Sequence, residues 1–85
     1  MTNIEYIKWF RENLVRGEKN DVQGIYNCTV GNYKFTTKRT KSGHLSLYDV
    51  TNDKVCIATR IYYDYGAIED SIYLYLYKKM GITKG

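Results

Sequence analysis

A chain of 85 residues that is 44% apolar and 26% charged and lacks proline has room for one domain with one modest core, which excludes a multidomain arrangement and a disordered tail. The formal net charge of +4 comes entirely from residues 22–48. That stretch holds no acid, and its basic residues are Lys34, Lys38, Arg39 and Lys41. Ten tyrosines against two phenylalanines favour half-exposed aromatic positions, where the ring is covered and the hydroxyl stays hydrated.

The N-terminal residues differ from those of a secretion signal, because Glu5, Lys8 and Arg11 interrupt the apolar core that such a signal requires. No later run approaches the roughly 18 apolar residues of a membrane span. Cys28 and Cys56 lack the spacing of a CxxC motif or a zinc site, so we expect reduced thiols, with a disulfide as the alternative. Together these features predict a cytoplasmic protein that does not contact a membrane.

A helix is predicted from about Asn3 to Arg16. Thr2 and Glu5 have capping-box spacing, in which each side chain accepts a hydrogen bond from the other residue's backbone N–H. Residues at helical spacing form an apolar stripe: Ile4, Ile7, Phe10 or Arg11, and Leu14. Gly17 is expected to end the helix in a left-handed conformation, and Trp9 to lie at the edge of the core.

Residues 22–38 predict a β-hairpin whose register follows from its turn. If Gly31 and Asn32 form a two-residue turn, the facing pairs are Val30 with Tyr33, Cys28 with Phe35 and Tyr26 with Thr37. These pairs share one apolar face. The opposite face is polar and basic, with Ile25, Asn27, Thr29, Lys34, Thr36 and Lys38. The agreement between turn chemistry and alternation supports this register.

A short polar turn at residues 17–21 is predicted to lead from the helix into the sheet, and a second hairpin turn is predicted at residues 41–43. A three-residue loop keeps Leu45 and Leu47 on the apolar face. Further along the same strand Tyr48 is out of phase with these leucines. This indicates either a bulge at Leu47–Tyr48 or a sheet covered on both sides. A turn at Asn52–Asp53 leads to a strand whose expected inward series is Val55, Ile57, Thr59 and Ile61.

The segment from residue 67 to 80 fits either a helix or a strand. As a helix it has a stripe of Ile68, Ile72, Leu76 and Met80, with acids in the first turn and Gly81 as a stop. As a strand from Ser71 to Lys78 it alternates aliphatic residues with Tyr73, Tyr75 and Tyr77, and we favour this interpretation. The predicted fold class is α+β, with the N-terminal helix packed on one face of an antiparallel β-meander of four to five strands.

The sequence carries no recognisable catalytic or metal-binding motif. The single histidine, His44, lies at a predicted hairpin tip, where no surrounding shell would orient it as a general base. Asp49, Asp53 and Asp64 lie in or beside predicted turns, where carboxylates cap backbone N–H groups. We therefore expect a protein that is not an enzyme and that needs no cofactor or metal.

The candidate binding residues form two groups. The first is a basic finger, consisting of Lys34, Lys38, Arg39, Lys41 and His44. The second is a tyrosine ladder, consisting of Tyr73, Tyr75 and Tyr77, which would share one strand face and offer surfaces for stacking. Each group also has a purely structural interpretation. Lysines keep sheets from pairing edge to edge, and tyrosine ladders pack across strands.

Two functions fit these residues. The first is a small protein-binding module that docks through the basic finger and the tyrosines on a larger protein. Such a module fits the role of an inhibitor of a host nucleic-acid enzyme, similar in style to the accessory proteins of phages and mobile elements. The second is a nucleic-acid-binding domain that uses the same surface. A net charge of +4 limits direct nucleic-acid binding to a few phosphates, and an acidic protein surface would attract the same residues.

Overall fold

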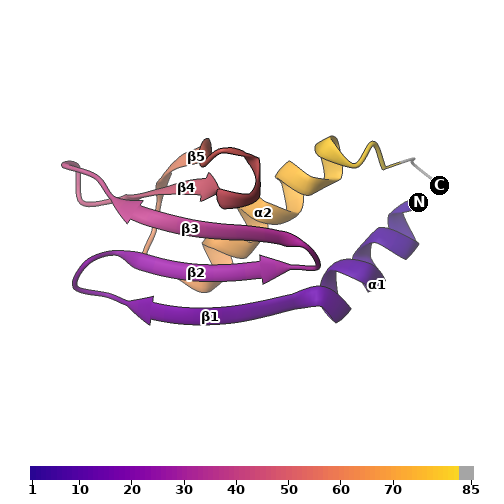
Figure 1. The fold of residues 1–85 in the computed structure, drawn as a ribbon, viewed down its shortest axis with the longest axis horizontal. Helices are drawn as coiled ribbons and strands as arrows, with labels where there is room; N and C mark the ends of the chain where they lie inside the picture. Colours follow the sequence, from indigo (N-terminus) through magenta and orange to yellow (C-terminus); the bar gives the residue numbers. More distant parts are fainter. Residues whose placement is uncertain (83–85) are drawn as a thin grey trace.

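The computed structural model describes residues 1–82 and contains a five-stranded sheet, two α-helices and one short 3₁₀ helix (Figure 1). In chain order the elements are α1 (Asn3–Asn13), β1 (Leu14–Asn20), β2 (Ile25–Val30), β3 (Tyr33–Arg39), β4 (Leu45–Asp49), η1 (Val50–Asn52), β5 (Val55–Ile61) and α2 (Tyr65–Lys79). All neighbouring strands are antiparallel, and the spatial order β1-β2-β3-β4-β5 is the order in the chain. The predicted α+β class, with a helix on a meander, is confirmed. The fifth strand, however, is β1 and not the tyrosine segment.

Helix α1 begins with the predicted capping box: the Thr2 hydroxyl accepts from the Glu5 N–H, and the Glu5 carboxylate accepts from the Thr2 N–H (2.9 Å). The hydrogen bond from the Thr2 backbone N–H to the carboxylate also lowers the pKa of Glu5. The helix ends at Asn13, whose side-chain amide donates to the carbonyl of Trp9 (2.8 Å). The prediction that it reaches Arg16 is therefore wrong.

The predicted apolar stripe of α1 is buried only in part, at Phe10, and Tyr6 replaces its isoleucines in the core. Tyr6 and Phe10 enter the core, while Ile4 and Ile7 are 75% and 37% exposed. The two aromatic residues are i and i+4 neighbours and bury more area than the isoleucines would, so they determine the rotation of the helix.

Strand β1 replaces the predicted polar turn at residues 17–21. Apart from Leu14 its residues are exposed, so the segment has no apolar period that marks it as a strand. Gly17 does not adopt a positive φ and does not cap a helix. A Cβ at Gly17 would lie 3.2 Å from the Cβ of Asn27 on β2, so glycine allows the close approach of the two strands there.

Both hairpin turns have the predicted geometry. Val30 faces Tyr33 and Cys28 faces Phe35 across the β2–β3 turn, where only Gly31 has a positive φ (60°), as in a type II′ turn. In the β3–β4 loop Gly43 has φ 84°, and Leu45 and Leu47 are both fully buried. The expected irregularity at Leu47–Tyr48 is also present.

The irregularity lies in the pairing of β4 with β5, and its extra residues belong to β5. Between Leu47 and Tyr48 strand β4 advances one residue while β5 advances two, from Ala58 to Cys56. A second shift lies between Leu45 and Leu47, where β5 advances three residues and Arg60 adopts φ 58°. These shifts break the strict alternation of the strand. The expected inward series is therefore wrong: Ile61 is buried, Ile57 is half-buried, and Val55 and Thr59 are exposed.

The tyrosine segment is helix α2, so the strand interpretation is wrong. Asp64 caps its start by accepting from the Ala67 N–H (3.2 Å). At its end the N–H groups of Gly81 and Ile82 donate to the carbonyls of Lys78 and Tyr77, which is a Schellman motif. The fully buried positions of α2 are spaced by four residues, at Ile68, Ile72 and Leu76.

The core lies between α2 and one face of the sheet, and α1 lies beside α2 past the end of the strands (Figure 1). Sheet residues that face α2 include Cys28, Val30, Phe35 and Leu47. Within residues 1–82, no helix is long and apolar enough to span a bilayer.

Candidate binding surface

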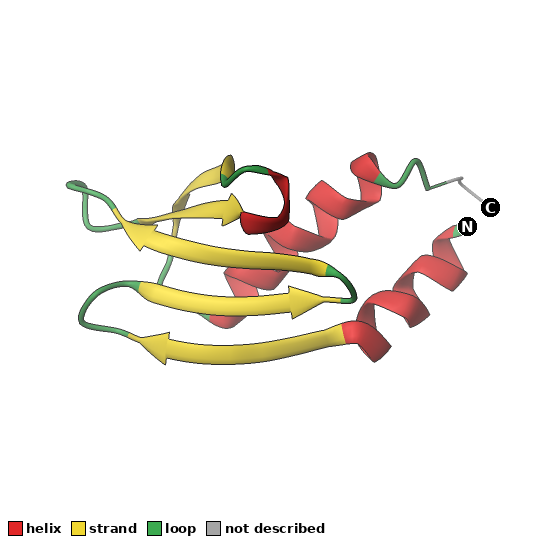
Figure 2. Ribbon diagram, viewed as in Figure 1, coloured by secondary structure: helices red, strands yellow, loops and turns green. Residues whose placement is uncertain are grey.

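The two faces of the sheet have different surroundings (Figure 2). Helix α2 lies behind the strands in this view, and neither α-helix of residues 1–82 crosses their front. On β3 the residues alternate between these faces: Phe35 and Thr37 are buried toward α2, while Lys34 and Lys38 are exposed on the opposite side. We call this second side the uncovered face.

Two shallow hollows of about 400 and 420 Å³ indent the uncovered face. The lining of the first includes Val15, Asn27, Thr29, Lys34, Thr36 and Val50. The lining of the second includes Ile25, Thr36, Lys38, Tyr48 and Lys54. Because Thr36 lines both hollows, they form one continuous surface across β1 to β4.

The uncovered face is basic and partly pre-ordered. Its hollows are lined by Lys34, Lys38 and Lys54, and none of the lining residues is an acid. The Thr36 hydroxyl donates to the side-chain oxygen of Asn27 (2.7 Å), which holds the amide in place between the strands. Within residues 1–82 these three lysines have no ion-pair partner within 4.0 Å, and they lie on a surface that also contains aliphatic, amide and hydroxyl groups. An acid, Glu18, lines an adjoining hollow that shares Ile25 and Asn27 with this surface.

The five residues of the predicted basic finger do not all lie on one surface. Arg39 lies four residues after Phe35 on β3, so the two share a face of the strand. The Arg39 guanidinium donates to the carbonyl of Val22 in the β1–β2 loop (2.7 Å). Lys41 is exposed at the tip of the β3–β4 loop. His44 is half-buried beside Tyr62, with ring centroids 5.7 Å apart. The structure thus places Lys34 and Lys38 on the uncovered face and the other three at the end of the sheet.

The three tyrosines do not form a ladder, because residues two apart on a helix point in different directions. All three are half-buried and pack on the core. The Tyr75 hydroxyl donates to the carboxylate of Asp49 (2.7 Å), and that of Tyr77 donates to the side chain of Asn3 (2.7 Å). Tyr73 packs on the ring of Tyr6 (4.9 Å between centroids). They lie across the sheet from the lysines, so the predicted joint surface of finger and ladder is wrong.

The core between the sheet and the helices is stabilised by polar contacts as well as by packing. The Tyr6 hydroxyl donates to the carbonyl of Tyr73 (2.6 Å), and burial raises the pKa of Tyr6 well above its usual range. Asp49 is fully buried and accepts from the Thr51 N–H (3.0 Å) as well as from Tyr75. Its carboxylate therefore has a structural role at the end of β4.

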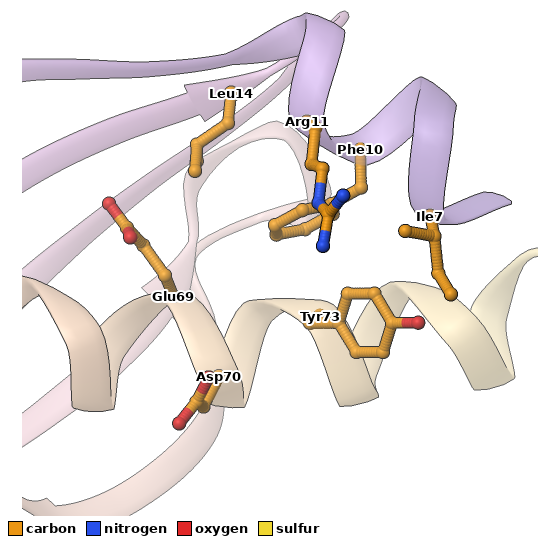
Figure 3. A pocket seen from close by; sticks show the side chains of 7 residues that line it. All are labelled: Ile7, Phe10, Arg11, Leu14, Glu69, Asp70 and Tyr73. Atoms are coloured by element: carbon orange, nitrogen blue, oxygen red, sulfur yellow. The ribbon is translucent and has the colours of Figure 1, made fainter.

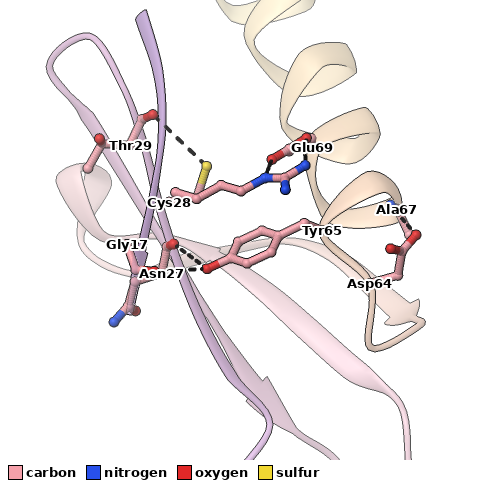
Figure 4. A network of polar contacts seen from close by, with 9 residues as sticks. Gly17, Asn27, Cys28, Thr29, Asp64, Tyr65, Ala67 and Glu69 are labelled. Atoms are coloured by element: carbon pink, nitrogen blue, oxygen red, sulfur yellow. Dashed lines mark hydrogen bonds and ion pairs between the residues drawn. The ribbon is translucent and has the colours of Figure 1, made fainter. Parts of the chain in front are cut away.

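A second polar cluster fastens the edge strand β1 to α2 (Figure 4). The Tyr65 hydroxyl lies 3.1 Å from the carbonyl oxygen of Gly17 and 3.2 Å from that of Asn27. The Arg16 guanidinium donates twice to the Glu69 carboxylate (2.7 and 3.2 Å), which raises the pKa of Arg16. Beside this pair, burial raises the pKa of the Cys28 thiol to about 11, so Cys28 is protonated at neutral pH.

The described part of the chain brings together no group of three metal-ligating side chains, and its two cysteines are not bonded to each other. Comparisons with protein-family models, curated proteins and solved structures found no significant match.

Sequence reasoning missed several members of this face, among them Val15, Tyr48 and Lys54. The sequence shows Tyr48 only as out of phase with the leucines, although that phase change itself places it on the face opposite Leu47. Lys54 reaches the second hollow because Asp53 and Lys54 both adopt left-handed conformations, with φ 54° and 55°. Asp favours such a turn, but nothing in the sequence shows that a lysine follows it in the same conformation.

Proposed function

We propose that the protein is a small, non-catalytic binding module that docks through the uncovered face on an acidic surface of a larger protein. The observation that carries this proposal is the set of Lys34, Lys38 and Lys54 around two hollows whose lining contains no acid. Complementary charge steers encounter and selects the partner, while apolar and tyrosine contacts supply the buried centre of an interface. Val15, Ile25 and Tyr48 provide such contacts.

The composition of the face favours a protein over a nucleic acid. The aromatic residues that line the two hollows are Phe35 and Tyr48, and Phe35 is buried, so Tyr48 alone presents a ring for stacking. Single-strand-binding sheets, in contrast, stack successive bases on several aromatic side chains. Three lysines neutralise about three phosphates, which gives weak and strongly salt-dependent binding. Direct nucleic-acid binding is the alternative function, and a single set of binding titrations with acidic peptide and nucleic acids separates the two.

The test compares fluorescence anisotropy of labelled poly-glutamate, single-stranded DNA, duplex DNA and RNA, each titrated with the protein at low and moderate salt. Changing Lys34, Lys38 and Lys54 together to glutamine is expected to weaken poly-glutamate binding by about tenfold, because each exposed ion pair contributes about 0.2–1 kcal/mol. The matched control changes Lys8, Lys78 and Lys79 to glutamine. It removes the same charge from the helices and is expected to bind as the unchanged protein does.

Equal effects of the two triple variants would contradict the proposal, because net charge alone would then explain binding. Tighter binding of DNA or RNA that depends on the three sheet lysines would favour the alternative. The inhibitor role is tested last, by affinity capture with the unchanged protein and with the sheet variant. A larger protein retained only by the unchanged form, and losing activity when bound, is the expected result.

A further inference from the structure

Helices α1 and α2 enclose a hollow of about 370 Å³ on the helical side of the molecule (Figure 3). Its apolar lining consists of Ile7, Phe10, Leu14 and Tyr73. It lies away from the uncovered face, since α2 covers the opposite side of the sheet. The hollow therefore belongs to a different surface from that of the proposed function.

The apolar stripe that marks α1 in the sequence reaches this hollow, and its two isoleucines remain exposed. Ile4 is 75% and Ile7 37% exposed, because Tyr6 and Phe10 take the buried side of the helix. Exposed aliphatic side chains beside an apolar hollow are typical of a surface that a partner covers.

Charges of opposite sign line the two walls of the hollow. Arg11 comes from α1, and Glu69 and Asp70 come from α2 (Figure 3). Glu69 is already neutralised by Arg16, at 2.7 Å. Within residues 1–82, neither Arg11 nor Asp70 has an ion-pair partner within 4.0 Å. One wall thus presents an unpaired cation and the other an unpaired anion, on either side of an apolar floor.

We propose that the occupant of this hollow is a second copy of the same chain, related by a two-fold axis. A two-fold interface requires a surface that is complementary to itself. Rotation about an axis over the hollow brings Arg11 of each copy against the partner's Asp70, so two identical ion pairs form. The same rotation covers Ile4 and Ile7 with the partner's α2.

The test is sedimentation velocity of the full chain from micromolar to millimolar concentration. The unchanged protein is expected to shift from monomer to dimer. Arg11→Asp alone or Asp70→Arg alone is expected to weaken self-association by at least about tenfold, because each replaces two opposite-charge contacts by two like-charge contacts. Lys41→Asp makes the same charge change as Arg11→Asp at the far end of the sheet and is expected to dimerise normally.

The decisive arm mixes the two single variants. Across a two-fold axis, Asp at position 11 of one chain meets Arg at position 70 of the other, and Asp70 of the first meets Arg11 of the second. The mixture is therefore expected to form a heterodimer, although neither variant associates alone. Circular dichroism and the melting temperature of each variant establish that it is folded. A protein that stays monomeric throughout the concentration range, or folded single variants that do not associate when mixed, would overturn the proposal.

Discussion

The two faces of strand β3 differ in chemistry, although successive residues of the strand point to one and then the other. Phe35 is 2% exposed and packs edge to face on Tyr75, whereas its neighbour Lys34 is exposed on the uncovered face. The covered face carries the packing and the buried polar contacts that hold the fold. The uncovered face carries charge that the fold does not use, because its lysines have no ion-pair partner within residues 1–82. This difference separates residues needed for stability from residues free to serve binding.

The largest expected difference between the faces comes from truncating these two neighbours. Phe35→Ala is expected to lower the free energy of unfolding by about 3–5 kcal/mol, the range for aromatic-to-alanine changes in a core. Lys34→Ala is the matched control and is expected to change it by less than about 0.5 kcal/mol. Urea denaturation followed by circular dichroism measures both. Similar losses in the two variants would mean that both faces are covered.

The next largest effect concerns the tyrosines behind the sheet. Tyr75→Phe removes a donor from the buried Asp49 carboxylate and is expected to cost about 1–3 kcal/mol. Tyr77→Phe removes the hydrogen bond to Asn3 near the N-terminus of α1 and is expected to cost about 0.5–1.5 kcal/mol. Thermal denaturation ranks the two variants. Equal small losses would fit a strand ladder with its hydroxyls in water and would contradict the helix.

A smaller effect, visible only in alkali, also belongs to the covered face. Burial raises the pKa of Cys28 from 9.0 to about 11, and the hydrogen bond to Asp21, followed by burial, raises that of Tyr26 from 10.0 to about 12. The folded state therefore holds these protons more tightly than the unfolded state does. Their stabilising contribution is complete below about pH 9 and is lost as the pH rises toward 11 to 12.

The melting temperature, measured in steps from pH 8 to 12, is expected to fall across this window. Cys28→Ala removes one of the two groups, so its melting temperature is expected to fall less between pH 9 and 11, whatever its value at pH 8. An unchanged slope in this variant would show that the thiol does not contribute.

The sequence predicts the central hairpins because the information there is local. Turn chemistry at Gly31 and Gly43 and the alternation along β2 and β3 specify the same register, so each supports the other. The same register correctly places Lys34 and Lys38 away from the core. Only this part of the candidate surface depends on neighbours in the chain alone.

The remaining elements depend on contacts between distant residues. Strand β1 has almost no apolar period, and its place is held by Arg16 with Glu69 and by Tyr65 with the backbone of Gly17. In α2 the spacing of the buried Ile72 and Leu76 fits both the two-residue alternation of a strand and the four-residue spacing of a helix face. Only the exposure of Leu74, which a strand would bury with them, distinguishes the helix from the strand. The cap at Asp64 and the stop at Gly81 are the local signals that favour the helix.

The smallest expected effect on stability is that of the three lysines on the uncovered face. Changing Lys34, Lys38 and Lys54 together to glutamine is expected to alter the free energy of unfolding by less than about 0.5 kcal/mol per site. A stability gain would indicate that the cations repel one another, and urea denaturation resolves either sign. A large loss would contradict the view that the fold does not use this charge.

The most direct test of the uncovered face as the binding surface is a titration of the ¹⁵N-labelled protein with poly-glutamate, followed by ¹H–¹⁵N chemical shifts. The largest shifts are expected at the amides of Thr29, Thr36, Tyr48 and Lys54, with α2 little changed. Shifts centred on α1 and α2, or confined to the 40–44 loop, would contradict the account.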